Sequence, residues 1–330
     1  MSEPLVSEQL VSKQHSGLAF VFPGQGSQKV GMLYELAECY SQVGDTFAEA
    51  SEALGYDVWK LAHQGPQEQL NLTERTQPVL LTASIAVWRV WQAEGGPWPS
   101  LLAGHSLGEW SALVAAEVLP FADALRLVRE RGRLMQEAVP AGQGGMAAII
   151  GLSDQQIIEA CEQASEGKVV APVNFNSPGQ VVIAGDAGAV ERATALCKSA
   201  GAKRALALPV SAPFHTSLMQ PAADGLASLV EATDFRAPRI PVVHNVHART
   251  ESDPQGIKRL MIEQITSPVL WVDCVRALNN QGVTLIVECG PGKVLAGLNK
   301  RIDKSIDNLS TESPRELEAA LTETTGAQDD

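Results

Sequence analysis

Leu101-Leu102-Ala103-Gly104-His105-Ser106-Leu107-Gly108-Glu109 is the stretch of sequence that decides the fold of this 330-residue chain. Its three leading apolar residues predict a short strand, and the pattern over 109–116 predicts a helix. The serine between them has a glycine two residues away on either side, which is typical of a sharp turn from strand to helix. The stretch predicts an α/β sheet with Ser106 as the candidate nucleophile. The alternative is a glycine-rich turn with an inert serine.

The flanking segments repeat this alternation of strands and helices. The predicted elements are a strand at 18–22, helices at 33–53, 77–94 and 121–137, and later strands at 242–245 and 284–288. Such alternation favours a sheet with helices on both faces.

Residues 140–208 carry a separate pattern. After a linker at 140–145 the predicted elements are a strand at 146–150, a helix at 153–164, strands at 169–175 and 180–184, a helix at 187–200 and a strand at 204–208. This β-α-β-β-α-β order is the ferredoxin-like arrangement. We therefore expect a small domain at 140–208, inserted into a larger domain formed by 17–139 and 209–302. A flexible N-terminal tail at 1–16 and a polar C-terminal tail at 303–330, in which 314–322 could form a helix, complete the prediction.

Composition narrows the class of protein. The formal net charge of −13 argues against nucleic acid or an anionic membrane as the main partner. Five cysteines, an odd number without a C-x-x-C pair, fit a reducing compartment better than a disulfide framework. The N-terminus lacks an apolar signal segment, and no apolar run is long enough to span a bilayer. We expect a cytoplasmic protein.

A serine nucleophile needs a base, and the chain has six histidines. His215 follows a predicted strand and a proline-stiffened loop, which suits a fixed catalytic group. A loop histidine without a catalytic role is the alternative. His105 adjoins the serine, so its side chain should point elsewhere. His244 and His247 are spaced for a metal, but no cysteine or carboxylate at ligand spacing accompanies them.

Seven motifs in order carry a family resemblance. They are Phe22-Pro23-Gly24-Gln25-Gly26-Ser27-Gln28, Gly104-His105-Ser106-Leu107-Gly108-Glu109, Arg131-Gly132-Arg133-Leu134-Met135-Gln136, Asn174-Phe175-Asn176-Ser177-Pro178-Gly179-Gln180, Pro213-Phe214-His215, Ser267-Pro268-Val269-Leu270-Trp271 and Glu288-Cys289-Gly290-Pro291-Gly292-Lys293-Val294-Leu295. Over 18–302 the chain resembles the free-standing bacterial malonyl-CoA:acyl-carrier-protein transacylases. It is more distantly similar to the acyltransferase domains of polyketide synthases.

The resemblance implies a fold and a mechanism. The fold would be an α/β-hydrolase-like core with an inserted ferredoxin-like (βαββαβ) domain. Ser106 would carry the acyl group in a ping-pong transfer, and His215 would be the general base. Gln264 would orient His215 through its main-chain carbonyl. The backbone N–H groups of Gln25 and Leu107 would form the oxyanion hole.

The resemblance also implies the substrates. Arg131 would hold the malonyl carboxylate, with Phe214, Met135 and Asn174 as further substrate-binding residues. Malonyl-CoA would be the donor, and the 4′-phosphopantetheine of an acyl carrier protein the acceptor, with no bound cofactor or metal. We expect a monomer serving fatty-acid or polyketide synthesis. A serine esterase or thioesterase and a non-catalytic docking module are the alternatives. From the residues alone, Arg131 could equally lie on a solvated basic face with Arg126, Arg129 and Arg133.

Overall fold

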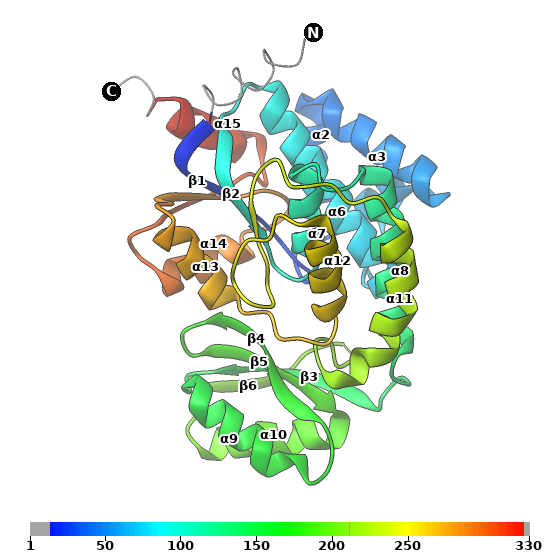
Figure 1. Cartoon of the computed structure of the whole chain (residues 1–330), viewed down its shortest axis with the longest axis vertical. Helices are drawn as coiled ribbons and strands as arrows, with labels where there is room; N and C mark the ends of the chain where they lie inside the picture. Colours follow the sequence, from blue (N-terminus) through cyan, green and yellow to red (C-terminus); the bar gives the residue numbers. More distant parts are fainter. Residues whose placement is uncertain (1–13, 211, 327–330) are drawn as a thin grey trace.

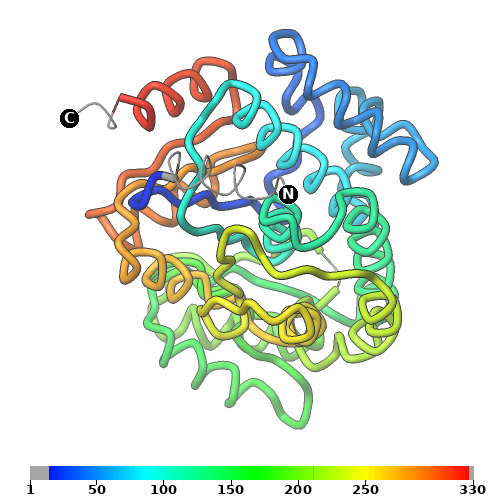
Figure 2. The backbone as a smooth tube through the Cα atoms, turned by 45° about the horizontal axis from the view of Figure 1, so that its top comes forward, coloured from blue at the N-terminus to red at the C-terminus, as the bar shows by residue number. Residues whose placement is uncertain are grey.

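Two β-sheets organise the chain in the computed structural model, which describes residues 14–210 and 212–326. The larger sheet is parallel throughout, in the order β7-β2-β1-β8-β9. Its strands span Val242–Val243 (β7), Trp98–Gly104 (β2), Gln14–Phe22 (β1), Leu285–Glu288 (β8) and Asp307–Ser310 (β9). Strands β1 and β9, from the two ends of the described chain, thus share one sheet (Figure 2).

Helices cover both faces of this sheet (Figure 1). Phe20 and Phe22 of β1 pack into one core cluster, and Ala19 and Val21 pack into another on the opposite face. A strand buried on both faces is what a central position in a parallel sheet requires. The helices of the larger unit are α2 (Tyr34–Cys39), α3 (Ser41–Leu54), α4 (Val58–Gln64), α5 (Gln67–Leu70), α6 (Thr73–Ala93), α7 (Leu107–Ala115), α8 (Phe121–Glu137), α11 (Gln220–Ala232), α12 (Pro254–Glu263), α13 (Trp271–Asn280), α14 (Val294–Ile302) and α15 (Pro314–Gly326), with a 3-10 turn at Ser217–Met219.

The smaller sheet is antiparallel, in the order β4-β5-β3-β6. Its elements are β3 (Gly144–Ile150), α9 (Asp154–Ser165), β4 (Val170–Ser177), β5 (Gln180–Asp186), α10 (Ala187–Ser199) and β6 (Arg204–Ala207). Both helices lie on the face turned away from the larger unit (Figure 1). The order of elements matches the predicted β-α-β-β-α-β pattern.

The two predicted tails need correction where the structure describes them. Residues 14–16 belong to β1, and β9 lies inside the predicted polar tail, where it pairs with β8 in parallel. Helix α15 runs to Gly326, beyond the predicted 314–322. The sheet therefore continues past residue 302. Residues 1–13 and 327–330 of the predicted tails lie outside the described residues.

The N-terminal helices also differ from their prediction. The predicted helix over 33–53 is two helices, because Tyr40 has an extended backbone between α2 and α3. Helix α6 begins at Thr73, before the predicted start at residue 77, and it contains Pro78. No helix in the described part of the chain is long and apolar enough to cross a membrane.

Candidate active site

The turn between β2 and α7 is as tight as its glycines suggest. Ser106 has φ 51° and ψ −104°, a backbone conformation that costs energy in any residue but glycine. A Cβ at Gly104 would lie 2.0 Å from the carbonyl group of Gly108. A Cβ at Gly108 would lie 2.0 Å from the oxygen of Phe22 in β1. Glycine is therefore required on both sides of the serine, and the turn lifts Ser106 out of the sheet.

His215 and Gln264 meet Ser106 from distant parts of the chain. The Ser106 hydroxyl donates to His215 Nε2 over 2.8 Å, and His215 Nδ1 donates to the main-chain oxygen of Gln264 over 2.9 Å. Because a carbonyl oxygen only accepts, this bond places the proton on Nδ1 and leaves Nε2 free to receive one. Burial, together with the positive charge of Arg131, lowers the pKa of His215 to about 3. The imidazole is thus neutral at physiological pH and can act as a base.

Arg131 points from α8 into the same site. Its Nη2 donates to Ser106 Oγ over 3.1 Å and to Gln264 Oε1 over 2.9 Å, and its Nη1 donates to Gln77 Oε1 over 2.8 Å. The side chain is buried, and its Nε has no hydrogen-bond partner among the described residues. No carboxylate of the described chain lies within 4 Å of it. Burial lowers its pKa to about 10, so it stays positively charged at neutral pH.

The other arginines of this segment lie on the surface of the protein. Arg126 pairs with Asp123, and Arg133 pairs with Glu130 and Glu137. The alternative of a solvated basic face therefore describes these residues and not Arg131.

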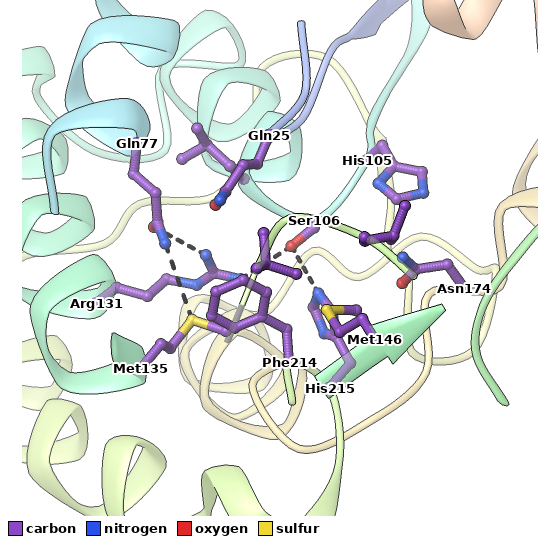
Figure 3. A pocket seen from close by; sticks show the side chains of 13 residues that line it. Gln25, Gln77, His105, Ser106, Arg131, Met135, Met146, Asn174, Phe214 and His215 are labelled. Carbon is purple, nitrogen blue, oxygen red and sulfur yellow. Dashed lines mark hydrogen bonds between the residues drawn. The ribbon is translucent and has the colours of Figure 1, made fainter. Parts of the chain in front are cut away.

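One cavity of about 120 Å³ collects most of the predicted site (Figure 3). Its lining includes Gln25, Ser106, Leu107, Arg131, Met135, Asn174, Phe214 and His215. Gln264 is the one predicted site residue that does not line it, and it reaches the site through its bonds to His215 and Arg131. His105 also lines the cavity, but its Nε2 bonds to Asn176 Oδ1 over 2.8 Å and not to the serine. Gln77 and Met146 line the cavity as well, and neither is predicted from the sequence.

Comparison with known proteins gives the family. The model of the family described as acyl transferase domain matches residues 19–313. The chain belongs to the acyl transferase family. It is 60% identical to the malonyl CoA-acyl carrier protein transacylase of Salmonella typhimurium, over 92% of this chain and 99% of that protein. The resemblance indicated by the seven motifs is thereby confirmed.

Solved structures similar to this acyl transferase have the same fold. An acyl carrier protein S-malonyltransferase from Vibrio cholerae is 59% identical, with a TM-score of 0.90 over 92% of this chain and 99% of that one. A malonyl-transacylase in complex with a type II PKS acyl-carrier protein is 54% identical, with a TM-score of 0.92 over 93% and 100% of the two chains.

Gln25 and Leu107 both line the cavity that contains Ser106. Leu107 is the first residue of α7, so its N–H has no partner within the helix. Gln25 lies in a loop that touches the turn, since a Cβ on Gly24 would lie 2.5 Å from the oxygen of His105. Neither N–H has a hydrogen-bond partner within the described residues. Two free donors beside a nucleophile suit an oxyanion.

Asn245, Glu109 and His244 form a buried polar network with Gln264, the one of these four that is predicted as a site residue. Asn245 makes two hydrogen bonds to the backbone of the serine turn. Its Oδ1 accepts from Ser106 N over 2.7 Å, and its Nδ2 donates to Gly104 O over 2.7 Å. Glu109 accepts from His244 Nδ1 over 2.7 Å and from Gln264 Nε2 over 2.7 Å. His244 therefore serves this network. The described residues contain no group of three side chains that could hold a metal ion.

Proposed function

We propose that this acyl transferase moves a malonyl group from malonyl-CoA to the phosphopantetheine thiol of an acyl carrier protein, through a malonyl ester on Ser106. The observation that carries this proposal is Arg131, a buried cation without a carboxylate partner in the described chain, 3.1 Å from Ser106 Oγ. A guanidinium binds a carboxylate through two parallel hydrogen bonds. An acyl group that ends in a carboxylate fits this position, and the names of the relatives support malonyl.

In the first half-reaction Ser106 Oγ attacks the thioester carbonyl carbon of malonyl-CoA while its proton passes to His215 Nε2. The N–H groups of Gln25 and Leu107 donate to the oxyanion of the tetrahedral intermediate. The carbon–sulfur bond then breaks, and coenzyme A leaves with the proton from His215. Because Gln264 O holds Nδ1–H, the imidazole keeps its orientation as it takes and returns the proton.

In the second half-reaction the carrier protein's thiol attacks the ester carbonyl of malonyl-Ser106. His215 takes the thiol proton and returns it to Ser106 Oγ as the ester bond breaks, which releases the malonyl thioester and restores the enzyme. Coenzyme A and the carrier protein bring the same pantetheine arm to the site. A second hollow of about 420 Å³ shares Gln25, His105 and Asn174 with the cavity and opens beside Val294 of α14. We assign the arm to this hollow.

Selectivity for malonyl over acetyl follows from the charge of Arg131 in this cavity. Phe214 and Met135 give it apolar walls, while Asn174 contributes a buried Oδ1 without a partner among the described residues. An acetyl group would leave Arg131 without a carboxylate, so acetyl-CoA should be the poorer substrate.

We further propose the finer description of the fold. The larger unit is an α/β-hydrolase-like core that also includes β9, and residues 140–208 form a ferredoxin-like insert. The parallel sheet with the serine turn after β2 and the order β4-β5-β3-β6 of the smaller sheet support this division. Asn174 lies on the insert and Ser106 on the core, so the site combines residues of both units.

Intact-mass spectrometry after mixing with malonyl-CoA tests the proposed function. We expect one malonyl adduct, absent from Ser106→Ala and discharged by holo carrier protein. Hydrolysis of malonyl-CoA by the wild type without carrier protein, and without an adduct, would instead indicate a thioesterase. An unmodified protein with intact malonyl-CoA would indicate a docking module.

A further inference from the structure

Gln264 connects Arg131 to a buried carboxylate. Its Oε1 accepts from Arg131 Nη2 over 2.9 Å, and its Nε2 donates to Glu109 Oε2 over 2.7 Å. All three side chains are buried. An amide held in this way turns its negative end toward the guanidinium and its positive end toward the carboxylate. In a low dielectric such a chain of polarised bonds transmits part of the attraction between the two charges.

The contacts of Glu109 are all with hydrogen-bond donors. Its donors are Gln264 Nε2, His244 Nδ1 at 2.7 Å and the Asn245 backbone N–H at 3.1 Å. His244 Nε2 is buried without a hydrogen-bond partner in the described chain. Three donors, and no direct contact with a lysine or arginine side chain in the described chain, suit a carboxylate whose charge balances Arg131.

We propose that Glu109 is the counter-charge of Arg131, placed one amide away so that the guanidinium is balanced yet free to bind the substrate's carboxylate. The inference rests on the proposed function of Arg131. A carboxylate in direct contact would occupy the donors that the substrate needs, whereas a buried arginine without any counter-charge would be unstable. Glu109 is thus a positioning residue that tunes substrate affinity without touching substrate. Its charge also repels the carboxylate of the substrate, which keeps binding from becoming too tight.

Glu109→Gln tests the proposal, because it removes the charge and keeps the shape. We expect free malonate to inhibit Ser106 acylation more tightly than in the wild type, on the order of tenfold. We also expect the KM for malonyl-CoA to fall with kcat, since a tightly held product leaves slowly, while the KM for acetyl-CoA stays unchanged. If Glu109 had only a structural role, its substitution would weaken malonate binding or leave it unaltered. Either result would overturn the proposal.

The matched control is Glu288→Gln, assayed well above pH 7 because burial raises the pKa of this other buried glutamate to about 7. Glu288 accepts from the backbone N–H groups of Leu295 and Ala296 and is not linked to Arg131. Its replacement should leave the inhibition constant of malonate at the wild-type value. A shift equal to that of Glu109→Gln would show that any buried charge has this effect, which contradicts a specific link.

A second variant decides the matter if Glu109→Gln does not fold. Gln77 Oε1 accepts from Arg131 Nη1 over 2.8 Å, so Gln77→Glu combined with Glu109→Gln moves the counter-charge into direct contact. The double variant should fold and bind malonate at least tenfold more weakly than the wild type, on the order expected for a competing charge. Failure to fold, or wild-type affinity, overturns the proposal. Malonylation of wild-type Ser106 is measured in a separate experiment. A wild type that is malonylated, with variants that do not behave as expected, would overturn this inference and leave the proposed function standing.

Discussion

Arg131→Ala separates recognition of the malonyl carboxylate from the chemistry at Ser106. In the structure Arg131 Nη2 donates one hydrogen bond to Ser106 Oγ and one to Gln264 Oε1, and Arg131 Nε has no partner in the described residues. A malonyl carboxylate can take Nε together with the Nη2 proton that now points to the serine. The substrate therefore forms two charge-assisted hydrogen bonds with Arg131, and one of them replaces the bond from Nη2 to Ser106 Oγ.

The net gain is one charge-assisted hydrogen bond, which contributes about 1.5–3 kcal/mol. At 1.36 kcal/mol for each factor of ten, Arg131→Ala should lower the ratio of kcat/KM for malonyl-CoA to that for acetyl-CoA by roughly 10- to 150-fold. Acetyl transfer makes no use of this bond and should change much less.

The assay is the rate of Ser106 acylation by each thioester, followed by intact mass so that only competent molecules are counted. Phe214 offers a matched control, since Phe214→Leu alters the apolar wall of the cavity and leaves Arg131 in place. Its malonyl-to-acetyl ratio should stay close to the wild type. Equal losses of malonyl and acetyl transfer in Arg131→Ala would refute carboxylate recognition by this residue.

Two further predictions follow from the site. The rate of Ser106 acylation should stay constant as the pH falls well below the ordinary titration range of imidazole. The reason is that the pKa of His215 is lowered to about 3 and the base works only when neutral. Arg131→Ala removes a charge that lowers this pKa, so the acid limb of the acetyl-CoA profile should move to higher pH, and coincident profiles would contradict this. Gly108→Ala should lower the free energy of unfolding by about 1–3 kcal/mol or more, because its Cβ would lie 2.0 Å from the oxygen of Phe22. In urea titrations Gly44→Ala, inside α3 with open space around it, should instead raise that free energy by about 0.5–1 kcal/mol, and equal effects of the two would contradict the steric explanation.

The sequence predicts the serine turn well because its cause is local. Positions 104 and 108 are glycine because the backbones of the strand and helix leave no room for a Cβ. The apolar residues on either side predict the strand and the helix. The small antiparallel sheet is predicted for a similar reason. Its strands and helices follow one another within a short stretch of chain, so each element shows its own spacing of apolar residues.

Strand β9 could not be predicted in this way. Its residues, Asp307–Ser310, are mostly polar and only partly buried, so no apolar pattern predicts a strand there. What holds it is the parallel register with β8, from Leu285 opposite Asp307 to Glu288 opposite Ser310. Main-chain pairing depends on which edge of the sheet is left open, and the local sequence does not record that.

The partners of Ser106 show the same limit at the site itself. His215 lies 109 residues from the serine and Gln264 lies 158 residues from it, so their meeting is a property of the fold. Gln264 has no periodic or spacing signal, yet its main-chain oxygen accepts from His215 Nδ1 and its side chain contacts Arg131. A chain that kept both glycines and Ser106 but lost the bonds of Gln264 would keep a nucleophile with neither an oriented base nor a fixed arginine. The local motif therefore predicts that an acyl group can be carried, and in the proposed function the distant polar residues determine which acyl group it is.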